Sequence, residues 1–279
     1  MRALVLLTSL AVACSGGGSE SGDPTSGATV TGDTVTGTEG VSGDPGPTTT
    51  ASGESTGGGV AVKGGYFRLQ SFGSTIQLLG NFLDSYNDGG GTTLGLCTKL
   101  GISTGLVHAG GTITVLRGAE VLLVAELPGA PTASATLAPG DSLSFEGAPP
   151  DGILPAFSAG PLVVPSTPTD VVGPDTITVG EAVTISWTPP ANAIGEVLVE
   201  LVQSQAGVNK IQCVVPVSDG SVTIDAGLLT HLVPSDADNP IVQMAVSPFA
   251  EVIAEVDGKA VEFEFLAGLA VFGAPVVGG

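Results

Sequence analysis

Basic residues are scarce in this sequence. It has 7 Lys and Arg against 27 Asp and Glu in 279 residues, which gives a formal net charge of −20. Nucleic acids and anionic lipid headgroups are bound mainly through Lys and Arg, because both ligands present phosphate groups that must be neutralised. We therefore expect neither nucleic acid nor an anionic headgroup as a partner.

Side chains that bind metals or act as catalysts are also few. The only histidines, His108 and His231, have no acidic or Cys neighbours at ligand spacing, whereas a zinc site usually shows clustered ligands such as C-x-x-C or H-E-x-x-H. Aromatic residues make up only 4% of the chain and Trp187 alternates with core positions, so we do not expect Phe157 and Trp187 to be sugar-stacking platforms. These shortages predict a protein that is not an enzyme and that uses no cofactor or metal.

The N-terminal residues indicate a location. Arg2 precedes an apolar stretch over residues 3–13, which is too short to span a bilayer. The tract Leu-Ala-Val-Ala-Cys ending at Cys14 resembles the lipobox of bacterial lipoproteins, although Ala11 stands where Leu is usual. The resemblance implies a signal peptide over 1–13 and a lipid such as palmitate on Cys14. An ordinary secretory signal cleaved near Ala-x-Ala is the alternative.

The residues after Cys14 predict a spacer. Residues 15–59 contain no Lys, Arg, aromatic residue, Leu, Ile or Met, so they cannot bury enough apolar surface to fold. We therefore expect a disordered Gly/Ser/Thr/Asp spacer over 14–59, spanning roughly 35–40 Å as a Gly-rich coil. Together with Ser15, which is not the Asp that marks inner-membrane retention in some envelopes, this predicts anchoring at the outer membrane or cell surface.

From about residue 60 the sequence turns to short β-prone segments divided by Gly, Pro, Asn and Asp. Apolar residues alternate with Thr and Ser over 183–187 and with Glu over 261–265. Such alternation predicts antiparallel sheets with one face in water. The further expected strands are 112–116, 120–125, 142–146, 161–164, 176–179, 196–202, 210–215, 221–224 and 241–246.

Two segments carry helical signals. Residues 74–86 have apolar positions at helical spacing, but a strand fits slightly better. Residues 225–232 follow a strand and predict one short helical turn with Asp225 as its cap. Long amphipathic helices between strands are missing from the pattern, which argues against a parallel α/β sheet.

A Pro-rich tract over 165–174 is the best candidate for a linker. It predicts a β-sandwich domain at 60–167 and a second one at 168–279, each near the size of an immunoglobulin domain. In the second, Trp187 in an early strand and the Leu-rich corner at 228–232 resemble a fibronectin type III or immunoglobulin-like module. The predicted fold class is therefore all-β, with one or two immunoglobulin-like antiparallel sandwiches after the tail.

The whole layout resembles a group of bacterial surface lipoproteins that have Thr/Gly/Asp-rich spacers and paired sandwiches. The tracts that carry this resemblance lie at 109–115, 155–158, 184–188 and 211–216. No activity is established for that group, so the resemblance implies none. It supports a membrane-anchored envelope lipoprotein whose sandwiches serve binding, adhesion or structure, with an unknown protein or glycan as partner.

Cys97 and Cys213 remain once Cys14 is assigned to the lipid. In an oxidising, exported setting two further cysteines predict a disulfide, and two lone core thiols are the alternative. A bridge closing so long a loop would stabilise the fold by about 4–5 kcal/mol in the chain-entropy model. It would also join the two predicted domains.

Two motifs leave other functions open. Gly-Ile-Ser-Thr-Gly at 101–105 matches G-x-S-x-G, so a tethered serine hydrolase using Ser103 and His108 is one alternative, although the residues that follow do not begin a helix. Asp84, Asp88 and Gly89 resemble the start of a calcium loop, but Tyr86 replaces a ligand and no Glu closes the loop. A calcium-dependent structural module is the other alternative, and Asp236 and Asp238 are further candidates for it.

Overall fold

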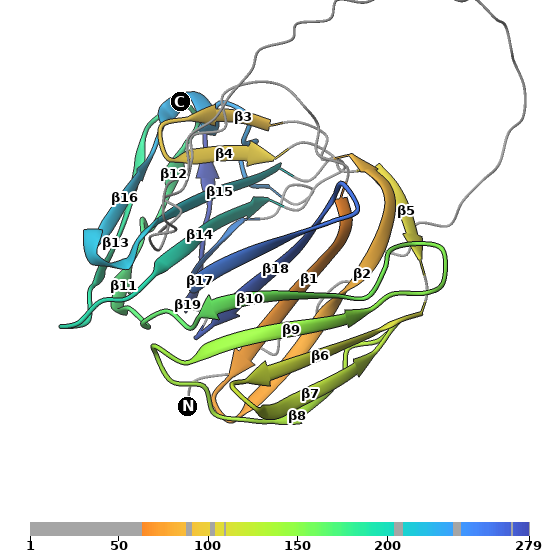
Figure 1. Ribbon diagram of the computed structural model, residues 1–279. Coiled ribbons are helices and arrows are strands. Elements are labelled where there is room, and N and C mark those ends of the chain that lie inside the picture. The colour runs from red at the N-terminus through yellow and green to blue at the C-terminus, as the bar shows by residue number, and fades with distance from the viewer. Residues whose placement is uncertain are drawn as a thin grey trace, which may run out of the picture. The chain divides into compact units, whose positions relative to one another are not determined.

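The computed structural model describes residues 63–87, 91–100, 104–108, 110–203, 209–236, 241–268 and 270–278. The predicted signal peptide, the spacer and Cys14 lie outside the described residues. Nearly all secondary structure in the described part is β-strand (Figure 1). The predicted all-β fold class is confirmed. No helix of the described part is long and apolar enough to cross a membrane.

The strands follow one another with short connections. The first ten are β1 (Lys63–Phe72), β2 (Thr75–Asn87), β3 (Gly91–Leu94), β4 (Cys97–Leu100), β5 (Thr104–His108), β6 (Thr112–Arg117), β7 (Glu120–Glu126), β8 (Thr132–Ser134), β9 (Ser142–Ala148) and β10 (Phe157–Val163). The others are β11 (Thr169–Val172), β12 (Ile177–Thr178), β13 (Val183–Thr188), β14 (Glu196–Gln203), β15 (Asn209–Pro216), β16 (Ser221–Ile224), β17 (Val242–Val256), β18 (Lys259–Ala267), β19 (Ala270–Ala274) and β20 (Val276–Val277). A 3-10 turn, η1 (Val217–Asp219), and one helical turn, α1 (Ala226–Leu229), complete the described elements.

Local sequence pattern explains most of these elements. Alternate residues of β13, from Val183 to Trp187, are buried, as the period-2 pattern predicts. Residues 75–86 of the segment 74–86 lie in strand β2, so the strand prediction is confirmed there. The short helical turn is confirmed too, because Asp225 accepts a hydrogen bond from the Gly227 N–H at 2.7 Å and caps α1.

One long sheet carries most of the strands, and we call it the shared sheet. Its order is β3-β4-β15-β14-β17-β18-β1-β2-β5, with β19 also pairing with β17 and β8 with β2. Three smaller sheets have the orders β10-β9-β6-β7, β11-β13-β16 and β12-β20. The smaller sheets pack against the shared sheet, and the two layers enclose the buried side chains.

Two large hydrophobic cores define two sandwiches, and a small third cluster in the described part is formed by Leu198, Phe249 and Leu266. In the first sandwich, β10-β9-β6-β7 packs on β1, β2 and β18 around a core that includes Phe67, Phe145 and Phe263. In the second sandwich, the sheets β11-β13-β16 and β12-β20 pack on β14, β15 and β17 around Trp187 and many aliphatic side chains. The shared sheet therefore forms one layer of both sandwiches.

Strand β17 makes the shared sheet continuous. Residues 242–249 of β17 pair with β14 or β19, and residues 249–256 pair with β18. Strand β18 in turn pairs in parallel with β1. Residues 249–256 of β17 and the β18 residues that pair with them form an arm that, at about 3.3 Å per residue, reaches roughly 26 Å. The hairpin β17–β18, from the C-terminal part of the chain, thus forms part of the shared-sheet layer of the first sandwich.

Strands from the N-terminal half of the chain likewise join the second sandwich. Strands β3 and β4 belong to the N-terminal half in sequence, but β4 pairs with β15 at the edge of the second sandwich. Strand pairing therefore crosses the predicted domain boundary at 167/168 in both directions, and the segments 60–167 and 168–279 do not each build a sandwich alone. Alternation reports which face of a strand is buried but not which strand lies beside it, so the sequence pattern could not reveal this exchange.

Candidate functional site

The structure brings Cys97 and Cys213 together. The two residues lie opposite each other on β4 and β15 with their Cα atoms 4.1 Å apart, and a disulfide joins them across 116 residues of sequence. Both side chains are buried in the second core. The bridge therefore ties the hairpin β3–β4 to the strand that it pairs with.

The other predicted site residues are not assembled into a site by the described part of the chain. Ser103, Asp88, Gly89 and Asp238 lie outside the described residues. His108 lies half-buried at the end of β5, opposite Phe82 on β2. The hydrolase and calcium alternatives therefore stay predictions. Within the described ranges, no group of three or more His, Cys, Asp and Glu side chains is arranged to hold a metal ion.

The two aromatic residues considered for sugar stacking pack in the cores. Trp187 is 5% exposed, and its indole Nε1–H donates a hydrogen bond to the Val217 carbonyl at 2.8 Å. Phe157 is half-buried against Phe82, with ring centroids 6.4 Å apart, and against Phe263 at 6.2 Å. Both residues pack in the cores, and for Trp187 this confirms the prediction from its alternation with core positions.

A polar cluster on the shared sheet was not anticipated from sequence. It lies on the face turned away from the first core, because Arg68 and Glu264 alternate with core residues of β1 and β18. The Arg68 Nε and Nη2 atoms donate to Glu264 Oε2 at 2.8 and 2.7 Å, and the Tyr66 hydroxyl also donates to this oxygen. Burial first, and then the Glu264 charge, raises the pKa of Tyr66 above its ordinary value, so the hydroxyl stays a donor.

A second ion pair lies on β14 and β15, on the same face of the shared sheet. Lys210 Nζ lies 2.7 Å from Glu200 Oε1, and Gln212 Nε2 donates to that oxygen at 2.6 Å. Burial opposes ionisation of Glu200, but the charge of Lys210, these hydrogen bonds and the charge of Arg68 outweigh it and hold the pKa of Glu200 below its usual range. Arg68 and Lys210 are each paired with a carboxylate, so the cluster links neighbouring strands rather than presenting charge to a ligand.

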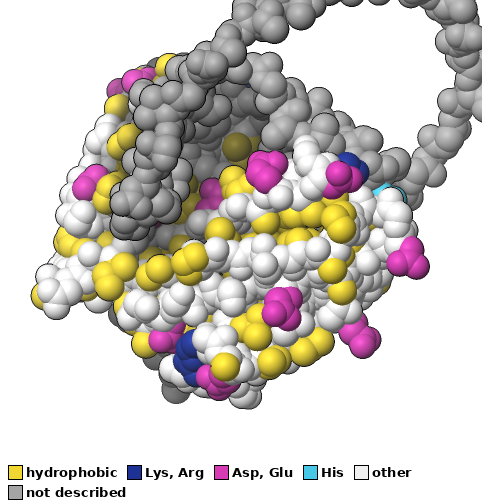
Figure 2. Space-filling view, in the orientation of Figure 1, with side chains coloured by type: hydrophobic (Ala, Val, Ile, Leu, Met, Phe, Trp, Pro, Cys, Tyr) yellow, Lys and Arg dark blue, Asp and Glu magenta, His cyan; other side chains and the backbone are white. Residues whose placement is uncertain are grey.

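Among the charged side chains on the surface of the described part, acidic ones predominate. Figure 2 shows Asp and Glu side chains spread over the visible face, with Lys and Arg at only a few places. This distribution matches the composition of 27 acidic and 7 basic residues. A partner that meets this surface is favoured if it is basic.

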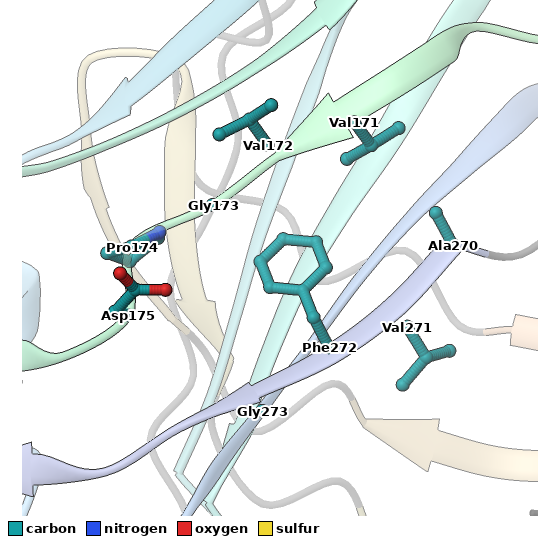
Figure 3. Close-up of a pocket in the computed structure, with 9 residues that line it drawn as sticks. All are labelled: Val171, Val172, Gly173, Pro174, Asp175, Ala270, Val271, Phe272 and Gly273. Carbon is teal, nitrogen blue, oxygen red and sulfur yellow. The ribbon is translucent and has the colours of Figure 1, made fainter. Parts of the chain in front are cut away.

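A groove opens at the edge of the second sandwich, between β11 and β19 (Figure 3). It has a volume of about 420 Å³, in the range of ligand pockets. Phe272 extends from β19 towards β11, and its ring lies against Gly173, where any Cβ atom would overlap it. The lining is formed by Val171, Val172, Gly173, Pro174, Asp175, Ala270, Val271, Phe272 and Gly273.

The two walls of the groove are strand edges. Strand β11 pairs with β13 and strand β19 pairs with β17, and within the described ranges neither has a partner on its other side. Beyond the groove the two chains converge, because β12 and β20 pair in parallel with Ile177 opposite Val276. The groove therefore lies where the edge strands β11 and β19, one from each layer of the second sandwich, diverge.

Comparison with known proteins identifies no family. No family model matches the chain, and no curated protein matches it. Solved structures do match, among them the fibronectin domains FN1–FN3 of chicken CNTN1, at 9% identity and a TM-score of 0.21. That match covers 77% of this chain and 65% of the other, so it spans just under two thirds of the latter. The chain is an all-β sandwich protein on the strength of its own strand pairing.

Proposed function

We propose that this chain is a membrane-anchored envelope lipoprotein whose paired sandwiches serve binding, adhesion or envelope structure without catalysis. The observation that carries the proposal is the shared sheet. Because each sandwich contains strands from both halves of the chain, the two sandwiches are coupled through a continuous hydrogen-bonded sheet. Such a body is suited to presenting a surface at the end of a tether and to bearing load between the tether and a partner.

The sequence before the sandwiches supports the anchoring part of the proposal. A lipobox-like tract ends at Cys14, and the polar residues 15–59 separate that position from the first strand. Stable anchoring needs more than one acyl chain, and a diacylglycerol thioether supplies two. The anchor is proposed to lie in the outer membrane or at the cell surface.

Metabolic labelling tests the anchor. Cells that express the full chain and are fed labelled palmitate are expected to incorporate label into this protein, and Cys14→Ser is expected to abolish the signal. The matched control is Cys97→Ser, which changes another cysteine and is expected to leave labelling intact. Labelling that survives Cys14→Ser, or a mature protein that begins elsewhere, contradicts the lipoprotein proposal.

The same protein allows the hydrolase alternative to be tested. The sequence Gly-Ile-Ser-Thr-Gly around Ser103 is the observation that favours a hydrolase. A fluorophosphonate probe labels only an activated serine, so we expect no labelling of the wild-type chain. Labelling that Ser103→Ala removes would establish the hydrolase and overturn the non-catalytic role.

A further inference from the structure

The groove between β11 and β19 is built from two backbone edges. A strand edge presents unpaired N–H and C=O groups, which another extended chain can satisfy by adding to the sheet. Here two such edges face the same space, one from the sheet β11-β13-β16 and one from the shared sheet. A ligand that fits both edges is itself an extended polypeptide.

The side chains around the groove favour a ligand with apolar residues. Val171 and Phe272 turn inward and pack against the second core, whereas their neighbours Val172, 61% exposed, and Val271, 41% exposed, lie on the outer sides of β11 and β19 although both are large aliphatic side chains (Figure 3). Ile241, 47% exposed, lies over Gly273 and extends the apolar rim. Successive side chains of a bound strand point to opposite faces, so alternate positions of the ligand would meet this surface. β-branched residues suit these positions because they favour extended backbone and pack on such surfaces.

The acidic charge near the groove further restricts the kind of ligand that it favours. Asp175 is the one charged residue of the lining and is exposed, and Asp170 lies beside the groove on β11. The chain as a whole carries a net charge of −20. A Lys or Arg next to the apolar residues of the ligand would therefore be attracted both locally and at longer range.

We propose that the groove between β11 and β19 binds an extended segment of a partner protein that has β-branched residues at alternate positions and a Lys or Arg that meets Asp175. This inference deepens the binding role in the proposed function and rests on it. A second copy of this chain is a poorer occupant, because its excess of carboxylates would bring like charges together.

A synthetic peptide tests the proposal. The probe is fluorescein-labelled Lys-Val-Thr-Val-Thr-Val-Lys, titrated into the full chain carrying Cys14→Ser and followed by fluorescence anisotropy. We expect saturable binding that weakens as salt is raised, because part of the attraction is electrostatic. Two control peptides separate the contributions: one has Glu at both ends, and the other has its alternate backbone nitrogens methylated. Both are expected to bind at least tenfold more weakly than the probe.

Variants locate the site. Val172→Asp places a charge on the exposed side of β11 at the rim of the groove and is expected to weaken peptide binding at least tenfold. Ile253→Asp is the matched control, because Ile253 is 52% exposed on β17 and does not line the groove, and it is expected to leave binding unchanged. Asp175→Asn is expected to weaken binding severalfold in low salt and not in high salt. Thermal melting of each variant verifies that it is folded.

Several results would overturn the proposal. These are absence of saturable binding to the folded protein, equal binding of the methylated peptide, or equal loss in Val172→Asp and Ile253→Asp. Self-association that Val172→Asp abolishes, without peptide binding, would assign the groove to a second copy instead. Palmitate labelling is independent of the groove, so loss of the peptide site alone leaves the anchor proposal standing, and loss of labelling alone leaves the peptide site standing.

Discussion

The two sandwiches share a sheet but are held together by different means. The first core contains stacked and edge-on Phe rings, with Phe263 at 4.3 Å from Phe145 and 5.1 Å from Phe67 between ring centroids. The second core is mainly aliphatic, with Trp187 as its buried aromatic residue, Phe272 packed against it and the disulfide at its edge. Each sandwich contains a hairpin from the other half of the sequence: β17–β18 in the first sandwich and β3–β4 in the second. The two hairpins differ in how they are attached.

The difference follows from how much apolar surface each of these hairpins buries. The arm of β17 and β18 lies in the middle of the shared sheet and contributes Phe263 and Phe265, both fully buried, to the first core. The hairpin β3–β4 lies at the edge of the sheet, and all four residues of β3 are exposed. An edge hairpin that buries so little gains little from the hydrophobic effect, and a covalent bond to β15 supplies the attachment.

Removal of the disulfide is expected to have the largest effect. Cys97→Ala with Cys213→Ala should lower the free energy of unfolding by about 4–5 kcal/mol, because the bridge closes a loop of 116 residues in the unfolded chain. Urea denaturation of the variant and of the parent, both with Cys14→Ser, measures the change. Titration of the unfolded, unreduced parent should find no free thiol, and two reactive thiols per chain would contradict the bridge.

The same experiment addresses the coupling of the sandwiches. Because β17 and β18 still cross from one sandwich to the other, the variant should unfold in one cooperative transition, with fluorescence of Trp187 and far-ultraviolet circular dichroism changing together. Two separated transitions would mean that the disulfide, and not the shared sheet, couples the sandwiches.

Truncation of the central ring in the first core is expected to have a similar or slightly smaller effect. Phe263→Ala removes a fully buried ring on β18 and should cost about 3–5 kcal/mol of unfolding free energy. Ile253→Ala, on the same hairpin but 52% exposed, is the control and should change stability by less than about 0.5 kcal/mol. Equal effects of the two substitutions would show that the arm does not pack as described.

The ion pair on β14 and β15 is expected to have the smallest effect and to depend on pH. The pKa of Glu200 is lower in the folded protein than in the unfolded chain, so its ionised form stabilises the fold above the unfolded value of about 4.3, and this contribution is lost as pH falls through the folded pKa. Glu200→Gln should therefore cost about 1–3 kcal/mol at pH 7 and progressively less in acid. Melting temperatures of the two proteins from pH 7 down to about pH 3 should converge. A difference that stays constant or grows in acid would contradict this assignment.

Local pattern was sufficient for the strands and for their buried faces. The alternation in 183–187 placed Trp187 in a core, and the turn signal at Asp225 placed the one short helical turn. The polar cluster was missed for a related reason. Glu262 and Glu264 were assigned to a wet face by alternation, but Glu264 is only 9% exposed and paired with Arg68 from β1, a strand nearly 200 residues away in sequence. Alternation predicts which side of the sheet a residue faces. The neighbouring side chains on that side then decide whether the residue is exposed to solvent.

The sequence by itself determined the all-β class, the positions of most strands, and the two cysteines available for a bridge. Only the tertiary structure decided that β17 and β18 enter the first sandwich, that β3 and β4 join the second, and that the Pro-rich tract at 165–174 contributes β11 to a groove facing β19. The physical reason is that propensity and burial act on each residue locally, whereas strand order is set by long-range pairing. That pairing is chosen by the combined packing of side chains from strands far apart in the chain.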